Sequence, residues 1–216
     1  MFKKIVNNLC VFNGNNLGNN SYLLKNNNHC VVIDPSSYAS DLISYIDSNN
    51  LTLDAILLTH AHYDHIESIN DLISHFNVKV YCHKNDEIVV NKYHCSKDIA
   101  NIEWKPIENS FIYFDSNELI LNNFKFEVLY TPGHTAGGVC YRYNNLIFTG
   151  DTIFYNSIGR WDLPTADRQL LFESVKKFIN WAKQDDLILS GHDSVYRPYS
   201  EVERVNPYIV HFKGVK

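Results

Sequence analysis

The segment Thr59-His60-Ala61-His62-Tyr63-Asp64-His65 carries the strongest structural and chemical signal in this 216-residue chain. It directly follows the apolar run Ala55 to Leu58, which is typical of a buried strand, and it precedes a helix predicted from Ile66 to Phe76. Open α/β structures place their sites at the carboxyl ends of such strands. Four side chains that can ligate a metal therefore lie within six residues, at a position where a site is expected.

The spacing inside this segment predicts that it serves two adjacent metal positions. In an extended turn, His60 and His62 point the same way because side chains alternate along the chain. Asp64 and His65 lie at the expected helix entrance and are turned toward a neighbouring position. One loop can therefore supply ligands to two ions.

Three further candidates stand in one shared setting, a strand that ends in a glycine-containing turn. They are Pro132-Gly133-His134, Thr149-Gly150-Asp151 and Ser190-Gly191-His192. Glycine allows the sharp turn that projects the next side chain into a site. A single histidine at a strand end is more often a packing or surface residue, but seven such side chains in this order favour a metal centre. The isolated histidines are interpreted as packing or surface groups: His29, His75, His83, His94 and His211.

The rest of the chain alternates strand and helix signals. Residues 22–24 and 31–33 read as a hairpin bounded by the turn Asp34-Pro35, and residues 111–149 are mostly β. Helices are predicted at Tyr38–Ser48, Ile66–Phe76 and Arg168–Ala182, with strands at Ala55–Leu58, Val78–Cys82, Phe124–Tyr130 and Leu187–Ser190. Two halves rich in βαβ units imply two sheets packed face to face with helices outside, in one domain over residues 1–216.

The ordered ligand set closely resembles the signature of the metallo-β-lactamase superfamily. The resemblance implies an α/β fold, the four-layer αββα sandwich with two mixed sheets. It implies one ion on His60, His62 and His134, a second on Asp64, His65 and His192, and Asp151 as a bridge. Imidazole and carboxylate ligands suit two zinc ions, with iron and manganese as alternatives.

Such a centre predicts a hydrolase whose nucleophile is a metal-bridging hydroxide. Metal charge lowers the pKa of a bound water, to about 7 for a single zinc. Asp64 and Asp151 are the expected catalytic carboxylates, with Asp64 also orienting the nucleophile.

The segment from Gly150 to Pro164 looks like that of glyoxalase II-like hydrolases, which cleave hydroxyacyl thioesters. The resemblance implies that Arg160 grips an anionic substrate tail by forked hydrogen bonds. Residues expected along the substrate are Phe154, Tyr155, Arg160, Trp161 and Asp162. Two features depart from the family: Glu67-Ser68 replaces a usual Gly pair, and Trp161 replaces a commonly small residue. Because only residues 193–216 follow His192, we expect a short form without the C-terminal helical domain that helps recognise glutathione.

The main alternative is a persulfide dioxygenase, which shares the histidine-rich loop but uses one iron. His60, His134 and Asp151 would then form a two-histidine, one-carboxylate triad. A lactonase or another ester hydrolase ranks lower. A β-lactamase is disfavoured because Asp151 stands where those enzymes commonly have Cys or Ser.

Composition limits the remaining possibilities. A formal charge of −5 without a basic run disfavours nucleic acid, and no apolar run approaches the roughly 20 residues that span a membrane. The five cysteines are scattered with no CxxC pair, so neither disulfides nor a cysteine metal site is expected. We expect a cytoplasmic enzyme acting on a small-molecule thioester, and the sequence leaves its oligomeric state open.

Overall fold

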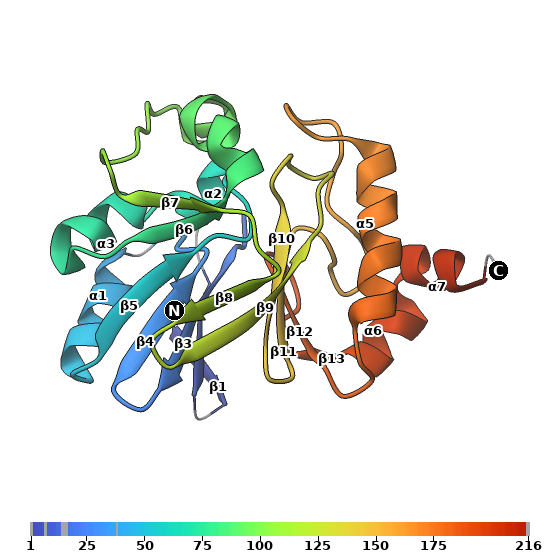
Figure 1. Ribbon diagram of the computed structural model, residues 1–216, viewed down its shortest axis with the longest axis horizontal. Coiled ribbons are helices and arrows are strands. Elements are labelled where there is room, and N and C mark those ends of the chain that lie inside the picture. Colours follow the sequence, from blue (N-terminus) through green and yellow to red (C-terminus); the bar gives the residue numbers. More distant parts are fainter. Residues whose placement is uncertain (1, 7, 14–16, 38, 215–216) are drawn as a thin grey trace.

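Two β-sheets dominate the computed structural model, which describes residues 2–6, 8–13, 17–37 and 39–214 (Figure 1). The first sheet contains, in spatial order, β1 (Phe2–Val6), β2 (Leu9–Asn13), β3 (Asn20–Asn26), β4 (His29–Ile33), β5 (Thr52–Leu57), β6 (Val80–His83) and β7 (Phe111–Phe114). The second contains β13 (Arg197–Pro198), β12 (Leu187–Ser190), β11 (Leu146–Gly150), β10 (Val139–Tyr143), β9 (Phe124–Tyr130) and β8 (Glu118–Leu121).

Both sheets are mixed, as predicted. Strands β1 to β4 pair antiparallel, whereas β4 to β7 run parallel, with Val31 opposite Ala55. In the second sheet β11 and β12 are parallel, with Ile147 opposite Ile188, and the other pairs are antiparallel. Parallel neighbours end at the same edge of a sheet, so the loops after β4, β5 and β6 lie together, as do those after β11 and β12.

Side-chain alternation along the strands produces the four predicted layers. Leu57 of β5 packs with Phe126 and Phe148 between the sheets, while Ile56 packs on the opposite face, toward the helices. The helices α1 (Ala39–Ser48) and α3 (Ile69–Phe76) cover the outer face of the first sheet. On the second sheet, α5 (Arg168–Trp181), α6 (Tyr199–Val205) and α7 (Pro207–Gly214) cover the outer face (Figure 1). The αββα sandwich is confirmed.

The helix predicted over residues 66–76 is confirmed only from Ile69 to Phe76, because the chain forms two helices here. Residues Tyr63–Ile66 form a short helix, α2, and α3 begins only at Ile69. Ser68 lies between the two helices and interrupts the helical hydrogen bonding. Its N–H donates to Pro35 O at 3.1 Å, and its hydroxyl donates to Ser36 O. Asp64 and His65 therefore lie within α2.

Other elements match the predictions closely, with shifted ends. The hairpin is β3–β4, β9 and β12 have the predicted bounds, and α5 ends one residue early at Trp181. The predicted start of the first helix, Tyr38, lies outside the described residues. Strands β1, β2 and β13 and helices α4 (Ser96–Ala100), α6 and α7 were not predicted. Across the described residues, every helix is too short or too polar to cross a bilayer.

Candidate metal centre

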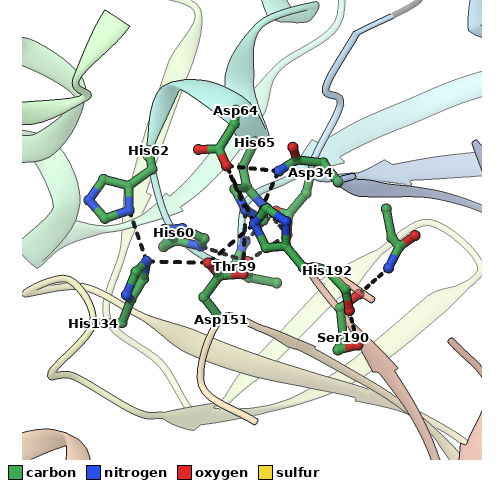
Figure 2. Close-up of polar contacts among 12 residues, drawn as sticks. Asp34, Thr59, His60, His62, Asp64, His65, His134, Asp151, Ser190 and His192 are labelled. Carbon is green, nitrogen blue, oxygen red and sulfur yellow. Dashed lines mark hydrogen bonds and ion pairs between the residues drawn. The ribbon is translucent and has the colours of Figure 1, made fainter. Parts of the chain in front are cut away.

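The seven predicted ligands converge at the loop edge where both sheets end (Figure 2). His60 and His62 follow β5, and the next two ligands belong to α2. The remaining three follow β9, β11 and β12, so both sheets contribute. All seven side chains are buried except that of His192, which is 19% exposed.

Three histidines form one end of the cluster, named here the imidazole half-site: His60, His62 and His134. One ring nitrogen of each lies within 4.8 Å of the other two. His62 Nδ1 and His134 Nε2 are 2.9 Å apart. The three rings thus direct nitrogen atoms at one common point.

A mixed half-site of Asp64, His65 and His192 forms the other end. His192 Nε2 is 3.4 Å from Asp64 Oδ2, and their ligand atoms lie within 4.8 Å of the one from His65. Asp151 stands between the half-sites: its carboxylate is 3.4 Å from His134 Nε2, 3.5 Å from His65 Nε2 and 3.4 Å from His192 Nε2. This one side chain contacts both ends of the cluster.

Hydrogen bonds at the far side of each ring set its tautomer. His134 Nδ1 lies 2.8 Å from Arg160 O, and His192 Nδ1 lies 2.9 Å from Leu17 O. A carbonyl only accepts, so Nδ1 carries a proton in both rings and Nε2 is the nitrogen that faces the cluster. His65 Nδ1 faces Asp34 Oδ2 at 3.1 Å in the same manner.

Asp34 is the hub of this outer support. Besides His65, it accepts hydrogen bonds from the Thr59 amide at 2.7 Å and the Thr59 hydroxyl at 2.6 Å. That hydroxyl lies 3.2 Å from His60 Nδ1. One buried carboxylate therefore holds a histidine of each half-site.

The imidazole half-site is electrically neutral near pH 7. Burial lowers the pKa of His62 to about 3 and places that of His60 well below its usual value. Burial also lowers the pKa of His134. Neutral imidazole is the form that binds a metal.

The mixed half-site is charged. Burial opposes ionisation there, yet the carboxylates of Asp151 and Asp64 raise the pKa of His192 to about 11 and also raise that of His65. In turn, these histidines lower the pKa of Asp151 to about 2, against the effect of burial. His65 lowers the pKa of Asp64 in the same way. These groups attract one another as ion pairs until a cation replaces the protons.

The donor atoms fit divalent metal ions. His60 Nε2, His65 Nε2 and Asp151 Oδ1 are buried and have no hydrogen-bond partner among the described residues. Burying such atoms without a partner is costly, and a metal ion would satisfy them. Ligands of one tetrahedral zinc ion lie about 3.3 Å apart, given Zn–N distances of about 2.0–2.1 Å. The separations in the cluster lie around that value: His62 Nδ1 and His134 Nε2 are 2.9 Å apart, and those within the mixed half-site are 3.4 Å for His192 and Asp64 and 3.9 Å for His65 and Asp64.

A cavity of about 660 Å³ opens over the cluster. Asp64, Asp151 and His192 lie on its wall together with Arg160. Its apolar walls are formed by Leu17, Ile99, Phe154, Ile158, Leu163 and Pro164. Phe154 and Arg160 are thus placed at the pocket, as expected for substrate-binding residues.

The other three expected substrate residues do not line this cavity. The Trp161 ring packs against Phe172 and Tyr208, with centroids 5.8 and 6.4 Å away. The Tyr155 hydroxyl donates to Glu201 at 2.6 Å. These aromatic rings pack with α5, α6 and α7, and neither Tyr155 nor Trp161 lines this cavity.

Asp162 instead binds Arg160. Its two carboxylate oxygens accept from Arg160 Nε at 2.7 Å and Nη2 at 2.9 Å. The side chains of both residues are more than 60% exposed. The fork expected to grip a substrate carboxylate is therefore occupied by a neighbouring residue.

Several site residues escaped the sequence analysis. Asp34 was read as a turn former, although it follows β4, the parallel neighbour of β5, and so lies at the same edge. Asn19, fully buried, donates to Asp64 Oδ2 at 3.0 Å. Cys95, Asp98 and Ile99 bring the α4 region into the pocket wall, with no motif to mark them.

Comparisons with known proteins agree with this geometry. Residues 14–192 match the family described as the metallo-beta-lactamase superfamily. The hydroxyacylglutathione hydrolase GloC of Haemophilus influenzae is 30% identical over 199 residues, which cover 88% of this chain and 92% of that protein.

Two solved structures also resemble the chain. BLEG-1, a B3 metallo-beta-lactamase, has a TM-score of 0.86 at 29% identity, covering 97% of this chain and 99% of its own. TTHA1623 in a di-iron-bound form has a TM-score of 0.81 at 28% identity, covering 92% and 98%.

Proposed function

This chain is a metallo-hydrolase of the metallo-β-lactamase superfamily, and we propose that it cleaves the thioester of a small acyl-thiol at a pair of divalent metal ions. Zinc is the proposed metal, with iron and manganese as alternatives. His60, His62 and His134 would hold one ion, Asp64, His65 and His192 would hold the other, and Asp151 would contribute to both.

The position of Asp151 is the observation that carries the proposal. Its carboxylate lies 3.4–3.5 Å from ring nitrogens of both half-sites, so one side chain can serve two ions. A paired-ion centre supplies acidified water and polarisation of the scissile carbonyl. This explains why no protein nucleophile is required.

The chain's own residues orient the reaction. Asn19 holds Asp64 Oδ2 at 3.0 Å, and Asp64 lines the cavity, so its carboxylate is positioned to accept a hydrogen bond from the attacking water. His134 and His192 are held by carbonyl groups at Nδ1, so Nε2 of each ring already faces the cluster. Such preorganisation lowers the cost of reaching the transition state.

The cavity and one relative support a thioester as the substrate. The apolar walls, Leu17, Phe154, Ile158 and Leu163 among them, suit an acyl chain and the soft sulfur of a thioester. GloC of Haemophilus influenzae is named a hydroxyacylglutathione hydrolase. We therefore propose hydroxyacyl-thiols as the first substrates to compare.

A substrate panel with defined metals tests the proposal. Zinc-loaded and iron-loaded protein would be assayed on lactoylglutathione, other acyl-thiols, a lactone, an oxygen ester, a β-lactam and glutathione persulfide. We expect kcat/KM for the best thioester to reach at least about 10⁴ M⁻¹s⁻¹ and to exceed that for every other class. Faster turnover of the β-lactam, or oxygen uptake with the persulfide by single-iron protein, would refute thioester hydrolysis.

A further inference from the structure

Asp86 is a buried carboxylate outside the ligand cluster, at the end of the 3₁₀ turn Lys84–Asp86 that follows β6. It accepts three hydrogen bonds from two other loops. Oδ2 accepts from the Ala61 amide at 2.9 Å and from the Thr135 hydroxyl at 3.0 Å, and Oδ1 accepts from the Gly137 amide at 2.5 Å. Its own side chain is fully buried.

The donors identify what Asp86 holds together. Ala61 stands between His60 and His62, and Thr135 directly follows His134. One loop follows a strand of the first sheet, and the other connects two strands of the second. The carboxylate thus joins the two loops that carry the imidazole half-site.

Gly137 shows how closely these segments approach. A Cβ atom at this position would lie 2.3 Å from the Asp86 nitrogen and 2.8 Å from its Cγ. Such contacts are impossible, so only glycine lets the amide reach the carboxylate. The local sequence is fitted to this contact.

The charge of the Asp86 carboxylate strengthens these hydrogen bonds. Burial raises the pKa of Asp86 to about 6, so the group is still ionised near pH 7 and accepts charge-assisted hydrogen bonds. Removal of the carboxylate would leave buried donors from both loops without an acceptor. The two loops would then move apart, so that these donors can bind water or other acceptors.

We infer that Asp86 is a positioning residue that sets the separation of the ligands His62 and His134, whose facing nitrogens are 2.9 Å apart. It acts through backbone and hydroxyl donors and touches neither ligand. The inference rests on the metal pair of the proposed function and is independent of which bond the enzyme cleaves.

Cobalt binding to the variant Asp86→Asn tests this role. Asparagine keeps the size but offers an NH₂ group where an oxygen accepted a hydrogen bond, so one loop must move. We expect cobalt affinity at the imidazole half-site to fall about tenfold or more, and the visible cobalt bands, which report ligand geometry, to shift. Both quantities are read without substrate.

Asp186→Asn is the matched control. Asp186 is equally buried and accepts from Arg142 Nη2 at 2.8 Å and the Lys183 amide at 2.7 Å, but it lies at the end of β12 opposite His192. We expect this variant to lower Tm while keeping wild-type cobalt affinity and bands. A purely structural role for Asp86 would give the same pattern in both variants.

If Asp86→Asn does not fold, the variants Thr135→Val and Thr135→Ser test whether Asp86 positions the ligands. Valine removes one donor to Asp86 with little change in volume, whereas serine retains it. We expect weaker cobalt binding with valine and rescue with serine. Wild-type affinity and bands in Asp86→Asn, or in Thr135→Val, would overturn the inference. A wild-type protein that binds no cobalt would instead refute the metal centre of the proposed function.

Discussion

The imidazole half-site and the mixed half-site contain three ligands each, yet they differ in charge. The imidazole half-site has neutral rings, since burial lowers the pKa of His62 to about 3. In the mixed half-site, His192 has a pKa of about 11 because Asp151 and Asp64 outweigh the effect of burial. One half therefore offers lone pairs directly, and the other must first release protons. Asp151 couples the two.

Removal of the Asp151 carboxylate, which contacts both half-sites, should have the largest effect on metal content and activity. Asp151→Ala takes a ligand from both half-sites, so we expect metal content to fall at both and activity to drop on the order of 10³-fold or more. Metal analysis and thioester assays measure this. Asp47→Ala is the control because Asp47 is an exposed residue of α1 that pairs with His75, and unchanged two-metal stoichiometry in Asp151→Ala would count against a bridge.

The half-sites can next be broken one at a time. His62→Ala should lose metal from the imidazole half-site and His192→Ala from the mixed half-site, each lowering kcat on the order of 10²-fold. Cobalt spectra of the two variants should differ because different ligand sets remain. Identical spectra would mean that a single shared site binds metal.

Weakening the outer support should have a smaller effect. Asp34→Asn disturbs the contacts to His65 and Thr59, and we expect about 10- to 100-fold weaker metal binding. Asp54→Asn is the matched control. An Asp54 carboxylate oxygen lies 2.8 Å from His29 Nδ1, and neither residue belongs to the metal centre. Chelator competition compares the two, and equal affinity would argue against Asp34 as a support.

The difference in charge between the two half-sites predicts how many protons are released when metal binds. His192 has a raised pKa, so its proton is bound near pH 7 and must leave when metal enters the mixed half-site. Affinity there should rise with pH by about tenfold per unit for each proton released. Calorimetry in buffers of different protonation enthalpy should show at least about one proton released, and the count should fall in His192→Gln. Release of no protons from the wild type would contradict the charged half-site.

The smallest effect should come from the pocket rim. Arg160 is bound by Asp162, and an exposed ion pair is worth about 0–1 kcal/mol. We expect Asp162→Asn to lower KM for anionic thioesters up to about fivefold, and Arg160→Ala to raise it, with neutral thioesters unaffected. Equal changes for neutral substrates would exclude recognition of a carboxylate.

The ligands were predictable because their signal is local. Each lies in a loop or short helix that comes after a strand, and strands that end at one edge bring these segments together, as β5 and β11 do. The split between α2 and α3 was hidden because it depends on Ser68 bonding a segment 32 residues earlier. The same holds for Asp86, whose three donors come from distant loops.

The residues that line the pocket were harder to predict than the residues of the metal-ligand cluster. Trp161 and Arg160 are neighbours in sequence, but one packs beside α5 and the other lines the pocket. Their adjacency in sequence does not determine which way each side chain points. The direction of the Trp161 side chain depends on its packing against α5 and α7, which are distant in sequence. The α4 wall, including Asp98, likewise depends on where the chain between β6 and β7 folds back.

Zinc titration of chelator-treated protein, with thioester cleavage followed at each addition, tests the paired centre most directly. Two zinc ions should bind per chain, and cleavage should reach its maximum only when the second is bound. Saturation at one ion with full activity would contradict a centre shared through Asp151.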